Sequence, residues 1–241
     1  MRQSFLSITI AATALLLTSC STTPLPSSRP ELAGDRIDYR DPPITQSLFN
    51  DKSATISEEN IQTILAGHYA LPETLRVALV KLDGGQRQRN YYYWTNEEYQ
   101  KTQQSYLDLF TEKFKASRRV ATVSVIPDLL ISRNPTFVNI RESSVRTQAD
   151  VVAIFSINSE IYSKYRAFSP DLIKAFATIE FILLDVRTGL IPFSTIVTKD
   201  YQSSKQKEDF GNQEAINRVK NEAVLLAINE IGEQLTKFLK K

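Results

Sequence analysis

Hydrophobic positions recur along this chain with two spacings, which divide most of it into helices and strands. Short runs of aliphatic and β-branched residues bounded by proline, glycine or charge indicate strands, whereas apolar residues three and four positions apart indicate amphipathic helices. These patterns predict helices over 58–67, 96–117, 137–149 and 213–241, and strands over 74–83, 118–127, 150–165, 172–186 and 190–202.

The order of these elements predicts the fold class. The first strands alternate with helices, as parallel neighbours joined by crossovers do, and the last three strands follow one another without a helix between them. We therefore expect an α/β (α+β) fold, with a mixed sheet of about five strands, two parallel crossovers and a C-terminal antiparallel meander, covered by helices.

Individual positions within these elements carry further expectations. Thr95 is placed to cap the helix that follows it, and Asp185 and Gly189 are placed to bracket a tight hairpin turn. The helix over 137–149 is expected to bury one side made of Phe137, Ile140, Ser144 and Val145.

The first 20 residues have a pattern of their own. Arg2 is followed by an uncharged, mostly apolar run from Phe5 to Ser19, which is the layout of a signal peptide. This run is shorter than the roughly 20 apolar residues that a membrane-spanning helix needs, and no later segment comes close, so no transmembrane helix is expected.

The apolar run ends in the sequence LTSC, whose last residue is Cys20. This sequence resembles the lipobox of bacterial lipoproteins. The resemblance implies that residues 1–19 are removed as a signal peptide and that Cys20 becomes an acylated N-terminus, carrying diacylglycerol and a fatty acid such as palmitate. Ser21 stands where an aspartate would suggest inner-membrane retention, which favours anchoring in the outer membrane, facing the periplasm.

The rest of the chain divides into a tether and one domain. Residues 20–55 are rich in proline, serine and charge, which predicts a flexible tether, and residues 56–241 form a single periplasmic α/β domain. Cys20 is the only cysteine, so no disulfide is expected. The net charge of +2, which falls by one when the segment containing Arg2 is removed, argues against a nucleic-acid partner.

Three blocks of the predicted domain resemble the bacterial rhombotarget lipoproteins, periplasm-facing proteins without an assigned activity. That family carries a glycine-rich, hydrophobic and basic tail, whereas this chain ends LTKFLKK, so the resemblance covers the core domain alone. More distantly, the hairpin sequence LDVRTG resembles the domain shared by the curli-secretion-channel lipoprotein and the penicillin-binding-protein activator lipoproteins. The three blocks are LRVALV (75–80), VSVIPDLLI (123–131) and ADVVAIFSIN (149–158).

One loop stands out as a candidate contact with a partner. The sequence RQRNYYYW combines aromatic and arginine side chains, the types enriched where proteins bind one another. A structural alternative is that Tyr92 and Trp94 cover the edge of the core. The candidate contact residues are Arg87, Arg89, Tyr91, Tyr92, Tyr93 and Trp94.

Residues suited to catalysis are scattered. His68 is the only histidine, and without a second histidine or a free cysteine a zinc-type site is not expected. Glu160 and Glu180 could lie on the wet faces of adjacent strands, where a glycosidase would need its two carboxylates roughly 5 to 10 Å apart. No nucleotide-binding or hydrolase motif occurs, so no cofactor and no catalytic residue is expected.

These observations lead to one hypothesis and two alternatives. The hypothesis is a non-enzymatic outer-membrane lipoprotein, held in the membrane by its lipid, whose domain binds another envelope protein or its own copies. The alternatives are an oligomeric, secretion-channel-like lipoprotein and an enzyme that acts on the cell wall or another glycan.

Overall fold

The computed structural model describes residues 48–49, 56–82, 97–131, 135–164 and 172–240. The strands are β1 (Leu75–Leu82), β2 (Val120–Val125), β3 (Val151–Lys164), β4 (Leu172–Asp185) and β5 (Phe193–Ser204). The helices are α2 (Glu58–Ala66), α4 (Glu97–Lys115), α5 (Phe137–Arg146) and α6 (Asn212–Leu239), with a 3₁₀ turn, η2 (Asp128–Leu130).

The strands form one mixed sheet in the order β2-β1-β3-β4-β5. β1 pairs in parallel with both β2 and β3, whereas β3, β4 and β5 pair antiparallel. This confirms the α/β (α+β) fold, with two parallel crossovers and a C-terminal meander. The chain steps outward from β1 to β2 and then back past β1 to β3, so right-handed crossovers place the two connecting helices on opposite faces.

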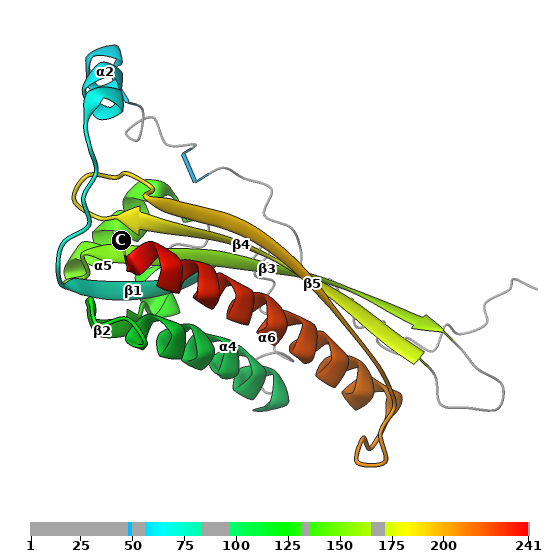
Figure 1. Cartoon of the computed structure of the whole chain (residues 1–241). Helices are drawn as coiled ribbons and strands as arrows, with labels where there is room; N and C mark the ends of the chain where they lie inside the picture. Colours follow the sequence, from blue (N-terminus) through cyan, green and yellow to red (C-terminus); the bar gives the residue numbers. More distant parts are fainter. Residues whose placement is uncertain (1–47, 50–55, 83–96, 132–134, 165–171, 241) are drawn as a thin grey trace, which may run out of the picture. The chain divides into compact units, whose positions relative to one another are not determined.

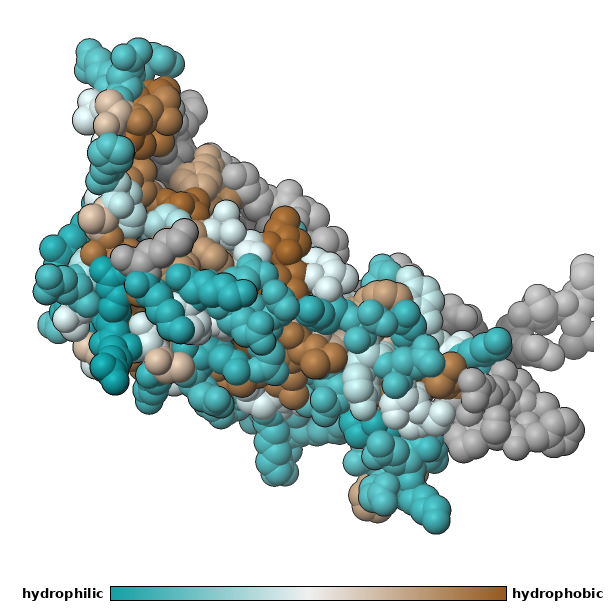
Figure 2. Space-filling view, in the orientation of Figure 1, coloured by the Kyte–Doolittle hydropathy of each residue, from teal (hydrophilic) through white to brown (hydrophobic). Residues whose placement is uncertain are grey.

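Helices α4 and α6 lie side by side on one face of the sheet (Figure 1). The 28 residues of α6 extend for about 42 Å, close to the roughly 46 Å spanned by the 14 residues of β4. One helix can therefore cover the long strands from end to end. The outward surface of α4 and α6 is mostly hydrophilic (Figure 2), as expected of amphipathic helices.

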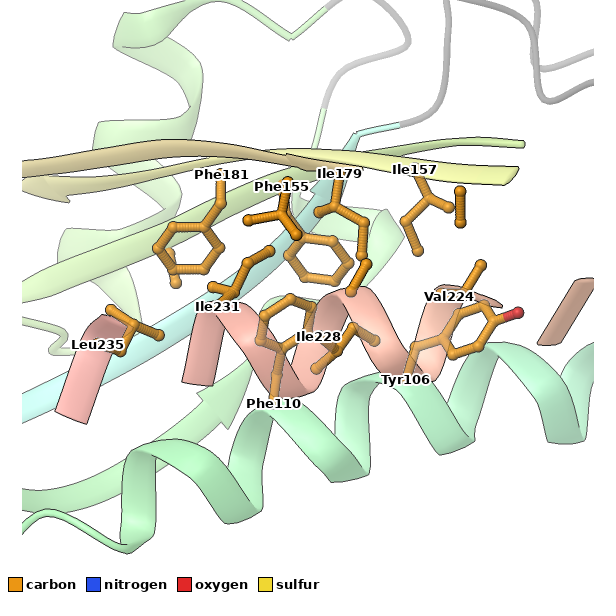
Figure 3. Packing of buried hydrophobic residues seen from close by; sticks show 14 of the residues in the cluster. Tyr106, Phe110, Phe155, Ile157, Ile179, Phe181, Val224, Ile228, Ile231 and Leu235 are labelled. Carbon is orange, nitrogen blue, oxygen red and sulfur yellow. The ribbon is translucent and has the colours of Figure 1, made fainter. Parts of the chain in front are cut away.

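The main core lies between this helix pair and the sheet (Figure 3). Phe110 of α4 is fully buried and packs its ring 4.4 Å from that of Phe155 and 5.7 Å from that of Phe181, measured between ring centroids. Side chains of α6 complete the layer at three- and four-residue spacing: Val224, Ile228, Ile231 and Leu235.

The opposite face of the sheet is covered at one end by α5, which packs on β1 and β3 in a second, smaller core. Thr136 begins this helix with a capping box, because its hydroxyl accepts from the Asn139 amide while the Asn139 side chain accepts from Thr136. Phe137 also contacts the chain upstream of the domain, since its amide donates to the Leu48 carbonyl at 2.7 Å and its ring stacks on Phe49.

The hairpin between β4 and β5 forms as predicted. Asp185 Oδ1 accepts from the Arg187 and Thr188 amides and the Thr188 hydroxyl, at 2.7 to 2.9 Å. Gly189 has a φ of 76°, and a Cβ there would lie 3.0 Å from the Phe137 ring. Glycine is therefore required at this position both by the backbone conformation and by the packing.

Two local expectations have other outcomes. Val145 is 57% exposed, so its placement on the buried side of α5 was wrong. At 100° per residue Val145 lies well round the helix from Ser144, which is fully buried. Thr95 lies outside the described residues, so its role as a cap stays a prediction.

The predicted helix after the tether is confirmed as α2, capped by Ser57 and followed by Gly67. None of its residues is buried, and Leu65 is 81% exposed. Among the residues described, no helix is long and apolar enough to cross a membrane.

Candidate functional site

The residues singled out in the sequence as lipid attachment and partner contact lie outside the described part of the chain. They are Cys20, Arg87, Arg89, Tyr91, Tyr92, Tyr93 and Trp94, and their roles stay predictions.

The described residues place the other candidates. His68 is exposed, and the described ranges hold no group of three or more His, Cys, Asp or Glu side chains that could bind a metal ion. Glu180 on β4 pairs with Ser156 on β3. Because Ser156 comes four residues before Glu160, the two glutamates are about 13 Å apart along the strands. Glu160 also accepts a hydrogen bond at 2.7 Å from Tyr162, on its side away from Glu180. The register therefore does not pair these carboxylates.

Helix α5 covers only one end of its face of the sheet. Beyond it, β3, β4 and β5 form a surface on that face that no described helix covers, here called the open face. Its residues are Asn158, Glu160, Tyr162, Lys174, Phe176, Thr178, Glu180, Ile196, Thr198 and Asp200. Polar contacts cross between its strands, since the Thr178 and Thr198 hydroxyls lie 2.9 Å apart and Lys174 pairs with Asp200 at 3.0 Å.

Apolar and aromatic side chains are set among these polar contacts. Tyr162 meets Phe176 edge to face at 5.7 Å between centroids, and the Lys174 ammonium lies 4.5 Å from the Phe176 ring centroid. Ile196, on β5, is 71% exposed. Aromatic groups are enriched in protein interfaces, whereas lysine, aspartate and glutamate are depleted there, so only the apolar and aromatic part of the open face resembles one.

A second candidate site is a pocket of about 340 Å³ at the amino ends of β1 and β3, here called the arginine pocket. Its walls come from four parts of the chain: β1, α5, the turn before β3, and the turn after β4. It is lined by Arg76, Arg141, Val145, Gln148, Ala149, Asp150, Val186 and Arg187.

The floor of the arginine pocket is a two-bond ion pair. Parallel pairing of Val77 with Val151 brings the preceding residues, Arg76 and Asp150, side by side. The Arg76 guanidinium donates to both Asp150 oxygens, at 2.8 and 3.0 Å, and the Arg76 amide donates to Oδ2 at 3.0 Å. These bonds to Arg76 hold the pKa of the buried Asp150 carboxyl below its ordinary value.

The other two arginines converge on the same place. Arg141 donates to the Val186 carbonyl at 2.6 Å and to the Arg187 carbonyl at 2.9 Å, which fixes α5 to the turn after β4. Arg187 reaches Asp150 Oδ1 with a longer contact of 3.4 Å. Arg76 and Arg187 therefore share one carboxylate, and Arg141 lines the same pocket with its guanidinium bonded to backbone carbonyls.

The turn before β3 brings a neutral amide into this charged pocket. Gln148 has a φ of 58°, a left-handed conformation that costs most non-glycine residues roughly 1 kcal/mol or more. Two backbone hydrogen bonds fix the turn: the Gln148 N–H donates to the Val145 carbonyl, and the Ala149 N–H donates to the Ser144 carbonyl.

Sequence reasoning missed the arginine pocket, although one signal was present. Arg76 and Asp150 are opposite charges at the starts of two otherwise apolar strands, and two parallel neighbours in register would pair them. The register is what a single sequence does not contain. Arg141 and Arg187 carried no such signal, because Arg141 reaches the pocket through the packing of α5 and Arg187 through the turn after β4.

Comparisons with known proteins give distant structural similarity alone. No family model matches the chain, and no curated protein matches it. A hypothetical protein from Chlamydia trachomatis is similar at 12% identity and a TM-score of 0.43, over 69% of this chain and 98% of that one. The PelC dodecamer from Paraburkholderia phytofirmans is similar at 13% identity and a TM-score of 0.34, over 71% and 91%.

A minor lipoprotein from Acinetobacter baumannii is similar at 10% identity and a TM-score of 0.33, over 67% of this chain and 92% of that one. Similarity at these identities and TM-scores carries no argument about the function of this chain.

Proposed function

We propose that the protein is an outer-membrane lipoprotein whose periplasmic domain acts as a non-catalytic binding and assembly module in the cell envelope. The observation that carries the proposal is the sequence LTSC, which ends at Cys20 directly after a short apolar run. A short signal peptide followed by a lipid-modified cysteine gives an anchored protein, because two or more acyl chains hold a domain stably at a membrane.

The open face supports a binding role for the anchored domain. It exposes Tyr162 beside Lys174, which pairs with Asp200, and it exposes Ile196 four residues before Asp200 on β5. The occupant that suits this mixture is another folded protein, either an envelope component or a second copy of this chain. We also propose that the rhombotarget lipoproteins are the kin of this domain, from the three shared sequence blocks.

Cross-linking in living cells tests the binding role. A photoreactive amino acid is placed at Ile196 on the open face, and separately at Trp94 in the aromatic loop. The matched control carries it at Glu233, which is exposed on α6. We expect a discrete cross-linked species from Ile196, from Trp94 or from both, and none from Glu233.

A second variant ties any adduct to the surface. Thr198→Asp places a charge two residues from Ile196 on the same exposed face of β5, so it should suppress the adduct formed at Ile196 while the protein stays folded. Adducts absent at both test positions, or equally strong at Glu233, would contradict a binding role for these surfaces.

A further inference from the structure

We propose that the arginine pocket binds a carboxylate carried by a small apolar group, as at the C-terminal residue of a peptide. The proposal goes beyond the binding role proposed above. It also does not depend on lipid attachment, because every residue that carries it belongs to the described domain.

The charge of the pocket favours an anion. Arg76, Arg141 and Arg187 line it together with a single acidic side chain, Asp150. One carboxylate cannot neutralise three guanidinium groups, so an uncompensated positive charge remains. Arginine clusters of this kind are the usual receptors for carboxylate and phosphate groups.

Arg187 is the guanidinium best placed to receive a ligand. Its side chain is 74% exposed, and among the described residues the hydrogen bond that it donates to a side chain is the long contact with Asp150. Arg76 is also 43% exposed although it is paired. Both guanidinium groups reach the same Asp150 oxygen, so they lie beside one another and present donors on one side of the pocket.

The remaining walls favour an apolar group next to the anion. Val145, Ala149 and Val186 line the pocket. A role in the pocket would explain why an apolar residue, Val145, is 57% exposed on the outside of α5. A volume of about 340 Å³ lies at the lower end of the range for small-ligand sites. It suits one amino-acid side chain with its carboxylate.

The apolar part of the lining favours a carboxylate on an apolar group over inorganic phosphate, which has no apolar surface to bury. The neutral amide of Gln148 adds a group that can donate a hydrogen bond to the ligand without adding charge. Its left-handed backbone keeps this side chain on the pocket wall at a cost that glycine would avoid.

An NMR titration of the full-length lipidated protein in detergent tests the proposal. The protein carries ¹⁵N-labelled arginine, and the side-chain Nε–H signals are followed as N-acetyl-L-leucine is added. N-acetyl-L-leucinamide, which has the same shape and no charge, serves as the matched ligand control. We expect saturable shifts of the Arg76 and Arg187 signals with the acid and not with the amide.

Two variants locate the site. Arg187→Gln should weaken binding of the acid by about tenfold or more, because it removes a charge-assisted hydrogen bond. Arg146→Gln is the control, since Arg146 ends α5, does not line the pocket and pairs with Glu142, and it should leave binding unchanged. Both side chains are largely exposed, so both variants should fold.

Three outcomes would overturn the proposal. They are no saturable shift with the acid, equal binding of the acid and the amide, and equal weakening by the two variants. Inorganic phosphate is titrated in parallel to separate the two classes of anion. If phosphate binds more tightly than the acid, and this binding is lost in Arg187→Gln, the pocket is a phosphate site and the carboxylate proposal is wrong. The titration can be repeated on Cys20→Ser, which lacks the proposed lipid. Failure of the pocket proposal is therefore distinguishable from failure of the lipid-anchor proposal.

Discussion

Asp209 and Arg218 fix the connection between β5 and α6. The Arg218 guanidinium donates to both Asp209 oxygens, at 3.0 and 2.8 Å, and also to the Ser204 carbonyl at 3.1 Å. The Gln206 amide donates to Asp209 Oδ2 at 2.7 Å. These bonds, chiefly those from Arg218, lower the pKa of Asp209 to about 2.

This lowered pKa predicts a dependence of stability on pH. The stabilising contribution of Asp209 is complete above its unfolded pKa of 3.8 and is lost as the pH falls toward the folded value of about 2. Asp209→Asn should therefore lower the free energy of unfolding at neutral pH, and its difference from the unsubstituted protein should shrink between about pH 4 and pH 2.

Urea unfolding at several pH values measures this difference. Glu208→Gln, a change at the exposed neighbour, is the control and should have little effect at any pH. A difference between Asp209→Asn and the unsubstituted protein that stays constant down to pH 2 would show that the carboxylate charge is not what stabilises this connection.

Single residues were predictable where their partners are close in sequence. Asp185 and Gly189 were placed in a hairpin turn because an aspartate and a glycine four residues later suit the two ends of a tight turn. The arginine pocket was not predictable in the same way, since Arg76 and Asp150 come from distant parts of the chain and meet through the sheet register.

At the scale of elements, α4 and α6 pack closely together at Gly232. A Cβ at this position would lie 2.5 Å from Cγ and 3.1 Å from Cβ of Lys113, so the stem of that lysine packs directly on the glycine. The clash involves the base of the side chain rather than its flexible end, so the helices would have to separate.

Gly232→Ala should therefore destabilise the protein by about 1–3 kcal/mol, although alanine is the better helix former by about 1 kcal/mol. Thermal or urea unfolding measures the change, with Glu233→Ala on the exposed side of the same helix turn as the control. Adding Lys113→Ala to Gly232→Ala should restore part of the loss. A more stable Gly232→Ala variant would mean that the helices are not held this close.

The elements themselves followed from hydrophobic spacing. Every predicted helix and strand is present, because each carries either a long apolar stripe or a run of β-branched residues. The error at Val145 arose where a ten-residue helix buries a narrow side, which makes the edge of the apolar stripe hard to place from spacing alone.

At the scale of the whole molecule, the fold class was predictable, and so were the solvent-facing positions of Glu160 and Glu180 on adjacent strands. The extent of the open face was not predictable. The order of helices and strands determines the crossovers and the meander. How far the second face is covered depends on α5, which has 10 residues, whereas β3 and β4 have 14 each. The sequence supplied a helix for that face, and its short length leaves the outer half of the long strands without a helix among the residues that the structure describes.

The proposed anchor makes a prediction for the molecule in the cell. Cys20→Ser removes the thiol that the lipid would modify, so the protein should move from the membrane fraction to the soluble periplasmic fraction and should no longer incorporate labelled palmitate. Ser21→Ala, beside the modified residue, is the control for fractionation and should remain in the membranes. Membrane retention and labelling of Cys20→Ser would contradict the lipoprotein assignment.

The position of β1 between β2 and β3 has a consequence for how the chain folds. β1 pairs with β3 although Val77 and its partner Val151 are more than 70 residues apart in the sequence. By contrast, β3, β4, β5 and α6 are consecutive along the chain. Contacts between distant residues cost more loop entropy and form more slowly. We expect the meander and α6 to fold first and β1 to join last, so the arginine pocket would be among the final parts of the domain to form.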